Sequence, residues 1–469
     1  MRVRLQTLGC RLNEAELESW ARDFQARGFT IVEDETAPAE LIVVNTCAVT
    51  GEAVRKSRQI LRRAQRRHPG ARLIVSGCLV SLDGDTARAG AAQTFPLSSL
   101  LPASTPPASS AELSEGLIVV NRDKDRLVEI VLAALGHAAD PPSPSAINAV
   151  NLAAPLFARG RQRAFVKIQD GCRYQCTFCV TTQARGPERS RPLPEIVREV
   201  ERFQDAGIRE VVLTGVHLGG YGADLGTDLT HLIERLLNET AIPRLRLGSL
   251  EPWDLPERFW SLFADRRLMP HLHLPLQSGS DRVLRRMARR CKRDEYIRLV
   301  EGARAAIPDL NLTTDIIVGF PGEDDDDWRQ TFELAESLRF GHIHVFGYSP
   351  RPGTPAAGFA NPVDARTRQR RVGELESLAH RSRLQILRDQ IGKTVMLLHE
   401  RLPDAFEGRP RSGYTPNYLP VHVRSAAPIG EGSLIQVRIT GLDEAAGLLI
   451  AEPTGVEPMA PECIEPAQA

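Results

Sequence analysis

The chain has 469 residues, and its 59 lysines and arginines balance 59 aspartates and glutamates, so the formal net charge is zero. This balance excludes a polycationic tail as the main feature of the protein, although local basic faces remain possible. The hydrophobic content of 42% is ordinary for a soluble globular protein, and the length favours about three domains. Because the sequence has neither a run of about 18 apolar residues nor a signal-peptide core at its start, we expect no membrane contact and a cytoplasmic location.

The N-terminal segment alternates apolar strands with amphipathic helices. Such alternation favours a doubly wound parallel sheet, so we predict an α/β domain over residues 1–137. Serine, proline and alanine are frequent at 97–112 and 138–154, which is typical of variable loops, and we place a linker at 138–157. The expected strands are 2–8, 41–45 and 72–76, and the expected helices are 14–27 and 53–67.

The central segment, residues 158–383, contains six strand candidates separated by helical stretches. Six strand–helix units predict a partial parallel barrel, whose active face is formed by the loops that follow the strands. The strands are expected at 164–168, 210–214, 244–248, 271–274, 312–318 and 342–348.

The C-terminal segment, residues 384–452, has short strand signals with glycine-rich turns. This pattern predicts a small antiparallel β-barrel of the size of an OB fold, followed by a tail at 453–469. The strands are expected at 394–399, 418–423, 434–439 and 447–451.

Three cysteines lie directly after the first barrel strand, in the pattern Cys172-x3-Cys176-x2-Cys179. Three thiolates on one tight loop can hold three irons of a 4Fe-4S cluster, and the missing fourth thiolate leaves one iron open to another ligand. The alternative is a zinc site, but zinc usually takes four ligands, and no nearby His or Cys supplies the fourth. We therefore predict a 4Fe-4S cluster at this loop.

Three further cysteines, Cys10, Cys47 and Cys78, each follow a predicted strand of the N-terminal sheet. The carboxyl ends of parallel strands share one edge of the sheet, so thiols far apart in sequence can converge there. Cysteine is also often buried without a further role, and a single such residue would favour that interpretation. Three at equivalent strand ends favour a second, auxiliary 4Fe-4S cluster. The pattern assigns no role to Cys291 or Cys463.

Two features indicate contact with nucleic acid. The expected helix at 53–67 is rich in arginine and could contact phosphates, although a solvated helix face explains the same charges. In the C-terminal module, tyrosines and arginines lie close together in a pattern that suits stacking on unpaired bases, although tyrosines in a small barrel mostly belong to the core. The residues concerned are Arg62 and Arg66 in the helix and Arg409, Arg411, Tyr414 and Tyr418 in the module.

The spacing of Cys172, Cys176 and Cys179 resembles that of the radical S-adenosylmethionine (radical SAM) superfamily. In that superfamily the open iron binds the amino and carboxylate groups of SAM, and the reduced cluster cleaves SAM to a 5'-deoxyadenosyl radical. The resemblance implies that Phe178, just before the last cysteine, packs near the adenine of SAM. Without the resemblance, Phe178 is equally well explained as a core aromatic residue.

Other residues near strand ends are candidate contacts for SAM. Glu251, two residues after Ser249, could bind a ribose hydroxyl, although a bare Ser-x-Glu pattern more often has no such role. Gly319 opens a Gly-Phe-Pro-Gly-Glu segment, where the backbone can approach a ligand closely and Thr314 and Asp315 add polar groups. An ordinary strand-to-helix turn explains the same glycines.

An N-terminal three-cysteine domain combined with a radical SAM barrel resembles the methylthiotransferase family. The match covers most of the chain, and the C-terminal module resembles a TRAM domain, a small RNA-binding barrel. Residues 48–50 and 413–418 look most like the branch of the family that methylthiolates carbon 2 of N-threonylcarbamoyl-adenosine beside the anticodon of tRNA. The matching segments include 8–10, 45–50, 169–172, 185–186, 190–192, 271–280, 319–323 and 348–354.

The resemblance implies a transferase that inserts sulfur at an unactivated carbon of tRNA. One SAM would donate a methyl group to sulfur on the auxiliary cluster, a second SAM would yield the radical, and flavodoxin or ferredoxin would supply electrons. The alternative substrates within the family are isopentenyl-adenosine in tRNA and an aspartate of a ribosomal protein. The alternative from another class is a non-catalytic RNA-binding protein that holds structural iron or zinc.

Overall fold

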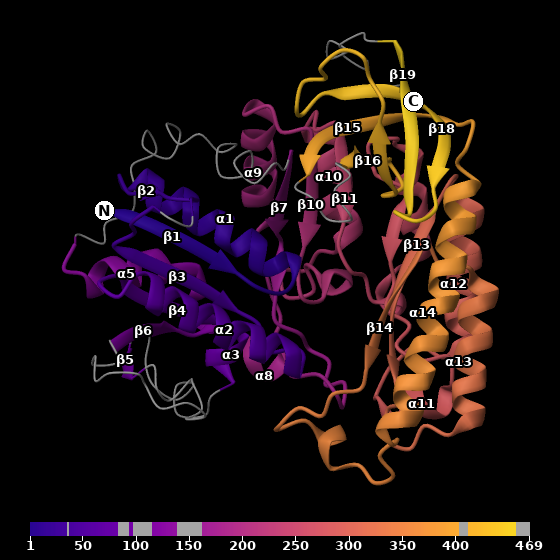
Figure 1. Cartoon of the computed structure of the whole chain (residues 1–469), viewed down its shortest axis with the longest axis horizontal. Helices are drawn as coiled ribbons and strands as arrows, with labels where there is room; N and C mark the ends of the chain where they lie inside the picture. The colour runs from indigo at the N-terminus through magenta and orange to yellow at the C-terminus, as the bar shows by residue number, and fades with distance from the viewer. Residues whose placement is uncertain (35–36, 83–92, 97–114, 138–161, 403–410, 456–469) are drawn as a thin grey trace.

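The computed structural model of the chain describes all residues except 35–36, 83–92, 97–114, 138–161, 403–410 and 456–469. The predicted loop at 97–112 and the predicted linker at 138–157 lie outside the described residues. An N-terminal α/β domain, a central partial barrel and a small C-terminal barrel follow one another, in the order expected from the sequence (Figure 1).

The N-terminal domain is a doubly wound sheet, as predicted. Its strands are β1 (Arg2–Thr7), β2 (Thr30–Ile31), β3 (Leu41–Thr46), β4 (Arg72–Gly77), β5 (Gln93–Pro96) and β6 (Glu115–Val119), and its helices are α1 (Arg11–Ala26), α2 (Gly51–Arg67), α3 (Cys78–Ser81), η2 (Asn121–Arg126) and α5 (Leu127–Ala134). The strand order is β2-β1-β3-β4-β6-β5, and β5 at the edge runs antiparallel to β6. Leu41 and Val43 of β3 pack with α1 and α5, whereas Ile42 and Val44 pack with α2, so alternate side chains bury the two faces of the sheet.

Six parallel strands form the central domain, and all six lie where the sequence predicts them. They are β7 (Arg163–Lys167), β10 (Glu210–Thr214), β11 (Arg244–Leu247), β12 (His271–His273), β13 (Asn311–Val318) and β14 (His342–Gly347). The sheets β11-β10-β7 and β12-β13-β14 are joined by bridges from Leu245 to Leu268 and from Ser249 to His273. The result is the predicted partial barrel.

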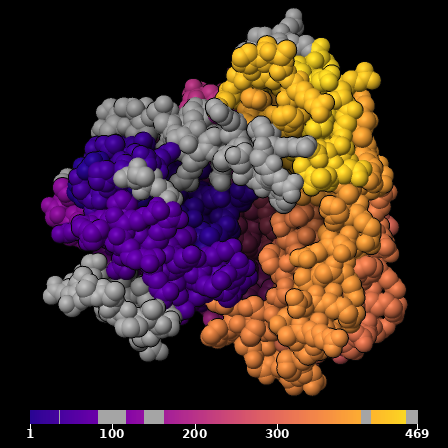
Figure 2. Space-filling view, in the orientation of Figure 1, coloured from indigo at the N-terminus to yellow at the C-terminus, as the bar shows by residue number. Residues whose placement is uncertain are grey.

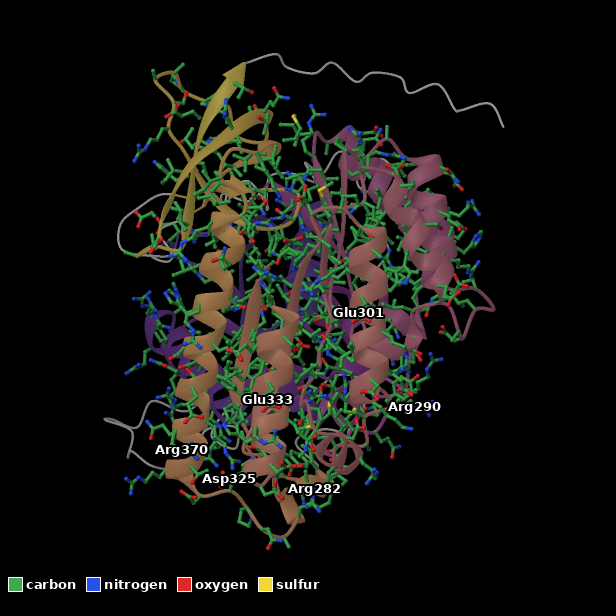
Figure 3. All side chains as sticks on the ribbon, turned by 90° about the vertical axis from the view of Figure 1, so that its right-hand side faces the viewer. Arg282, Arg290, Glu301, Asp325, Glu333 and Arg370 are labelled. Carbon is green, nitrogen blue, oxygen red and sulfur yellow. The ribbon has the colours of Figure 1, made fainter. Side chains whose placement is uncertain are left out.

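Helices cover the outer face of this barrel. Charged side chains such as Glu301, Glu333 and Arg370 lie on the solvent side of three of them (Figure 3). The helices and short segments of the domain are β8 (Gln169–Asp170), α8 (Thr181–Arg185), β9 (Arg189–Ser190), α9 (Leu193–Asp205), η3 (Leu218–Gly220), α10 (Leu229–Glu239), η4 (Pro252–Asp254), η5 (Glu257–Ala264), α11 (Asp281–Arg286), α12 (Arg293–Ala306), α13 (Asp325–Leu338), η6 (Pro355–Gly358) and α14 (Ala365–Arg388).

The C-terminal module is a closed five-stranded barrel with the order β15-β16-β17-β19-β18. Its strands are β15 (Thr394–Leu402), β16 (Arg411–Tyr414), β17 (Pro420–Val423), β18 (Leu434–Asp443) and β19 (Leu448–Gly455). The pairing of β17 with β19 is parallel, so the barrel is not antiparallel throughout. Strand β16 was not among the predicted strands, because it has no apolar alternation and contains Gly413, where a Cβ would lie 2.1 Å from the Leu398 carbonyl oxygen. Strand β19 also continues to residue 455, into the predicted tail, whose residues 456–469 lie outside the described part.

The C-terminal barrel closes one end of the central barrel. The segment between β16 and β17 lies against the amino ends of the central strands. There, Arg244 donates to the Thr415 carbonyl oxygen at 3.2 Å, and Asn311 donates to the Asn417 carbonyl oxygen at 2.8 Å. Both donors are the first residues of their strands, so this mouth of the barrel is filled by backbone of the neighbouring module.

Helix α1 packs inside the open side of the central barrel. Ala15 of α1 contacts Phe165 of β7 and Val212 of β10. Residues 164 and 166 of β7 instead face the helix-covered core, so Phe165 points to the inner face. Beside this contact, the surface is hollowed between the N-terminal domain and the part of the barrel coloured orange (Figure 2).

A buried group of charges joins the N-terminal domain to the central barrel. Glu16 on α1 binds Lys124 and Arg185, and the guanidinium group of Arg185 also lies 2.9 Å from Asp170. Lys167 of β7 pairs with Asp170 at 3.0 Å. Burial alone would raise the pKa of Glu16, but the charges of Arg185, Lys124 and Lys167 outweigh burial and hold that pKa well below its usual range.

Replacing the central cation of this group, in Arg185→Ala, should strongly destabilise the protein. The change leaves the buried carboxylates of Glu16 and Asp170 with fewer cationic partners, and breaking a buried pair in this way costs about 3–5 kcal/mol. We expect a lower midpoint of urea unfolding, measured by circular dichroism. The control Arg329→Ala, in an exposed pair with Glu333 on α13, should change the unfolding free energy by less than about 1 kcal/mol. Equal stability of the two variants would contradict this role of Arg185.

Candidate active site

The loop that follows β7 and β8 is closed at its base. Strand β8 pairs with β9, with Gln169 opposite Ser190, so the two ends of the loop are held together. Gly171 enters the loop with φ of 72°, and a Cβ there would lie 1.9 Å from the Pro187 carbonyl oxygen. Only glycine fits this turn, which directs the following cysteines to one side.

Three thiols converge within this loop. Electrostatic interactions join the sulfur of Cys172 to those of Cys176 and Cys179. The backbone N–H groups of Tyr174 and Thr181 donate to the Sγ atoms of Cys172 and Cys179, each at 3.4 Å. Because such donors favour a negatively charged sulfur, the loop is suited to hold thiolates.

Without a cation, these thiols are weak acids. Burial, together with Glu251 and the other two sulfurs, raises the pKa of Cys172 to about 12. Burial also raises the pKa of Cys176, against the opposing charge of Arg289. Three neighbouring thiolates therefore need a metal centre to neutralise them, and three thiolate ligands on one loop fit a 4Fe-4S cluster with one open iron.

The second set of cysteines converges at the carboxyl edge of the N-terminal sheet. Cys10 follows β1, Cys47 follows β3, and Cys78 begins α3 directly after β4. A Cβ added at Gly9 would lie 2.9 Å from the Sγ atom of Cys47, and electrostatic interactions join all three sulfurs. Burial raises the pKa of Cys10 and raises the pKa of Cys47 to about 11. The thiols therefore meet as the sequence predicts, and their role as cluster ligands stays a prediction.

Access to this second set is from the Cys10 side. Cys47 and Cys78 are buried, whereas the side chain of Cys10 is exposed to solvent. A group held by the three thiols would therefore be reached from the side of Cys10.

One short helix, α8, lies between the two sets. Its first residue, Thr181, donates to Cys179 of the loop, and Ala184 packs against Cys78 of the N-terminal set. Asn121 donates to the Ala184 carbonyl oxygen at 2.8 Å and to the Cys78 Sγ atom at 3.7 Å. Because an α-helix rises 1.5 Å per residue, these two contact points are only about 5 Å apart along the helix axis. The two thiol sets are therefore neighbours, although they belong to different domains.

A histidine held between two carboxylates supports the cysteine loop. His217 is fully buried, with Nδ1 3.0 Å from Glu188 and Nε2 2.6 Å from Asp254. Burial opposes the charged imidazole, but the hydrogen bonds to Asp254 and Glu188 raise the pKa of His217 to about 9. The hydroxyl of Tyr174 donates to Asp254 at 3.0 Å, so the imidazolium and its partners hold a residue that lies between two of the cysteines.

Two of the predicted SAM contacts border the cysteine loop. Glu251 interacts electrostatically with Cys172, and its Oε2 atom is buried without a hydrogen-bond partner among the described residues. Phe178 is half-buried, and its ring packs edge-on against Phe320 with centroids 6.5 Å apart. The same Oε2 atom lies 3.8 Å from Nε2 of His217, so it has a charged neighbour but no hydrogen bond. A carboxylate oxygen without a hydrogen bond fits a ribose hydroxyl, and a half-exposed ring fits an adenine.

The other predicted SAM contacts lie within the barrel wall. Thr314 is fully buried, and its hydroxyl is hydrogen-bonded to the backbone of Leu274 and Leu276, just after β12, so it has no exposed atom for a ligand. Gly319 packs against α14, where a Cβ would meet a side chain at 2.8 Å. Asp315 lies on the inner face, 3.3 Å from Nε2 of His273. Ser249 pairs with the backbone of the same histidine through the isolated β-bridge that joins the two sheets.

The tyrosines predicted to stack on RNA lie at the junction between the two barrels. Tyr414 and Tyr418 stack on each other, with centroids 4.6 Å apart and an interplanar angle of 14°. The guanidinium group of Arg163 contacts both rings, and that of Arg246 contacts Tyr418. These contacts occupy ring faces that a base would need.

The predicted RNA-binding arginines are distributed over two modules. On α2, Arg66 is exposed and Arg62 is half-buried. Arg411 begins β16, and Arg409 lies outside the described residues. Helix α2 therefore retains an exposed basic residue suited to phosphate.

Comparison with known proteins identifies the family. The Radical SAM superfamily matches residues 166–335, and Uncharacterized protein family UPF0004 matches residues 2–95. Threonylcarbamoyladenosine tRNA methylthiotransferase MtaB of Thermotoga maritima is 33% identical over 400 residues, which cover 85% of this chain and 86% of that protein. The chain belongs to the radical SAM methylthiotransferase family.

Other relatives agree with this assignment. MtaB of Bacillus subtilis is 32% identical, with 93% of each chain covered. The tRNA-2-methylthio-N(6)-dimethylallyladenosine synthase of Paracoccus denitrificans is 31% identical, with 95% of this chain and 96% of that protein covered. Among solved structures, the radical S-adenosylmethionine methyltransferase TsrM from Kitasatospora setae has a TM-score of 0.53 at 16% identity, with 76% of this chain and 75% of that chain covered, a likeness of fold alone.

Membership of the methylthiotransferase family makes this protein a transferase that uses SAM and a 4Fe-4S cluster. The prediction of the family and of the α/β fold is thereby confirmed. In the part of the chain that the structure describes, no helix is both long and apolar enough to span a bilayer.

Some residues that contact the thiols of this methylthiotransferase were not predicted from the sequence. Asn13 accepts a hydrogen bond from Cys10 at 3.9 Å, and its position three residues along α1 is a signal that helical spacing could have revealed. Asn121 and Arg289 also contact thiols of the two sets, but they come from distant segments and carry no local signal.

Of the two unassigned cysteines, Cys291 belongs to the main hydrophobic core of the central barrel. Its thiol donates to the Lys292 carbonyl oxygen at 3.5 Å, so it lies apart from the two thiol sets. Cys463 lies outside the described residues.

The charged state of His217 predicts how the stability of the protein depends on pH. The pKa of His217 is about 9 in the folded protein, against an ordinary value of 6.5. The charged imidazole therefore stabilises the fold fully below pH 6.5, and this contribution to the unfolding free energy is lost as pH rises through 9. We expect the wild-type protein to lose about 3 kcal/mol of unfolding free energy relative to His217→Gln over this range. Urea unfolding at a series of pH values provides the measurement. Parallel profiles for the two proteins would show that His217 is not protonated in the fold.

Proposed function

We propose that this methylthiotransferase modifies N-threonylcarbamoyl-adenosine in tRNA and uses two 4Fe-4S clusters. The observation that carries the proposal is the pair of three-thiol sets on either side of α8, one from each of two domains. Cys172, Cys176 and Cys179 would hold the cluster of the radical SAM family. The set of Cys10, Cys47 and Cys78 would hold the auxiliary cluster. The MtaB relatives support the choice of substrate, since their names specify threonylcarbamoyladenosine in tRNA.

When bound, SAM and the clusters supply radical chemistry, which an aromatic C–H bond requires because it is too strong for acid–base catalysis. The residues of the chain bind and orient the reactants. Glu251 would accept a hydrogen bond from a ribose hydroxyl of SAM through its Oε2 atom, which forms no hydrogen bond among the described residues, and Phe178 would pack against the adenine. Tyr174, held by Asp254 and His217, would keep the cysteine loop in one conformation.

The tRNA would lie across the N-terminal domain and the C-terminal barrel. Arg66 and Arg62 on α2 would contact phosphates, so affinity should fall as the salt concentration rises. The electron donor would be a small redox protein such as flavodoxin or ferredoxin, acting in the cytoplasm.

The proposal predicts about eight irons per chain after anaerobic reconstitution, because each cluster contains four. Replacing Cys172, Cys176 and Cys179 together with Ala should leave about half of the iron, and so should replacing Cys10, Cys47 and Cys78. Iron analysis and the visible absorption spectrum provide the measurement. Replacement of Cys291 by Ala is the matched control and should retain all the iron, since that thiol lies in the barrel core. Full iron content in either triple variant would contradict the ligand assignment.

The substrate is tested by mass spectrometry of tRNA nucleosides. Transfer RNA carrying threonylcarbamoyl-adenosine, incubated with reconstituted enzyme, SAM, sulfide and reductant, should yield its 2-methylthio derivative. A product on isopentenyl-adenosine instead, or on a ribosomal-protein aspartate, would transfer the assignment to another branch of the family. Reconstituted protein that binds tRNA but forms no methylthio product on any substrate would favour a non-catalytic RNA-binding role.

A further inference from the structure

We propose that the inner wall of the central barrel selects the substrate by its carboxylate, with Arg11 as the cationic partner and the His273–Asp315–His344 group facing it. The inference rests on the proposed function, since it concerns the threonylcarbamoyl group of the same substrate. It gives a role to Arg11, His273 and His344, which belong neither to the thiol sets nor to the predicted SAM contacts, and it assigns Asp315 to the substrate instead of to SAM.

Arg11 presents an accessible positive charge inside the molecule. It directly follows Cys10, and its guanidinium group lies 5.3 Å from the ring of Phe165, which points to the inner face of the barrel. The group also donates to the Tyr418 hydroxyl at 3.5 Å and lies 3.4 Å from the carboxylate of Glu14. Its side chain remains 51% exposed, so these contacts position the cation without covering it.

The facing wall is formed by three polar residues of neighbouring strands. On β14, Ile343 packs in the helix-covered core, so His344 points inward, and its side chain is exposed. The rings of His344 and His273 lie 5.6 Å apart, and Asp315 lies 3.3 Å from Nε2 of His273. Tyr418, which accepts a hydrogen bond from Arg11, has its ring 5.0 Å from that of His271, and His271 lies on the same face of β12 as His273. The cation and the imidazoles therefore lie on one side of the barrel wall, and His344 interacts electrostatically with Arg11.

This space is adjacent to both thiol sets. Arg11 is the residue after Cys10 on one side. On the other side, Asp315 interacts electrostatically with Arg289, whose guanidinium group lies 3.9 Å from the Cys176 sulfur. A base placed between the two sets would therefore have its substituent within reach of this wall.

The chemistry of the wall matches one of the candidate substituents. A threonylcarbamoyl group carries a carboxylate and a hydroxyl, whereas an isopentenyl group is wholly apolar. Guanidinium binds carboxylate through two parallel hydrogen bonds, and the exposed imidazole of His344 adds a donor. His273 is engaged by Thr313 and Asp315 and positions the carboxylate of Asp315. Asp315 offers an acceptor for the hydroxyl. An isopentenyl group would cover the exposed part of the Arg11 guanidinium group without offering it a hydrogen-bond acceptor, which disfavours that substrate.

The test compares anticodon stem-loop RNAs that carry threonylcarbamoyl-adenosine either as the free acid or as its neutral methyl ester. Reconstituted wild-type enzyme should prefer the acid, and Arg11→Gln should raise KM for the acid about 10- to 100-fold and abolish the preference. His344→Ala should weaken the preference, and Arg11→Lys should retain part of it. The control Arg329→Gln removes an exposed arginine of α13, also paired with a glutamate, and should behave as wild type. Fluorescence anisotropy of the same RNAs measures the preference independently of turnover.

Three results would overturn this inference. The first is an equal rise in KM for the acid and for the ester in Arg11→Gln, which would indicate that Arg11 has a structural role. The second is a wild-type enzyme that modifies both RNAs equally. The third is a stoichiometric metal ion, additional to the clusters, that is lost in His344→Ala, which would make the three polar residues a metal site. Wild-type enzyme that modifies neither RNA but does modify isopentenyl-adenosine would instead reject the proposed function itself.

Discussion

The buried contact of Arg185 with Glu16 and Asp170 is the interaction on which the arrangement of the site depends. Glu16 belongs to the N-terminal domain and Asp170 to the central barrel, and the guanidinium group lies 2.9 Å from each. Arg185 is also the last residue of α8, whose first residue donates to Cys179. One helix therefore positions the cysteine loop at its start and the domain interface at its end, so the separation of the thiol sets follows from a single rigid element.

The polar residues around the site divide into a structural group and an accessible group. His217 is fully buried between Glu188 and Asp254, and its charge is neutralised by those carboxylates. Arg11 is half-exposed, and its charge is available to a ligand. The same contrast separates Thr314, whose hydroxyl is hydrogen-bonded to backbone, from Glu251, whose Oε2 atom forms no hydrogen bond among the described residues. Exposure and free hydrogen-bonding capacity, rather than proximity alone, distinguish the residues suited to bind reactants.

Local signals predicted much of this architecture. The six barrel strands and the convergence of Cys10, Cys47 and Cys78 follow from apolar runs and from the rule that parallel strands share an edge, both readable from short segments. The environment of Tyr418 could not be read in this way, because its partners Arg163 and Arg246 are far away in sequence. Spacing alone indicated an aromatic and arginine pattern for RNA, whereas long-range packing placed those rings between two barrels. The contact of Asn121 with Cys78 was inaccessible for the same reason.

The C-terminal barrel covers the amino ends of the central strands and thereby limits access to the inner face of the central barrel. Thr415 and Asn417 are hydrogen-bonded to Arg244 and Asn311 at that end, so backbone of the C-terminal module lies across the amino ends of the strands. Reactants and products would then enter and leave beside the N-terminal domain, where the surface is hollowed (Figure 2). A nucleotide bound on that side would block access to the thiol sets. Its release would then have to precede the binding of fresh reactants.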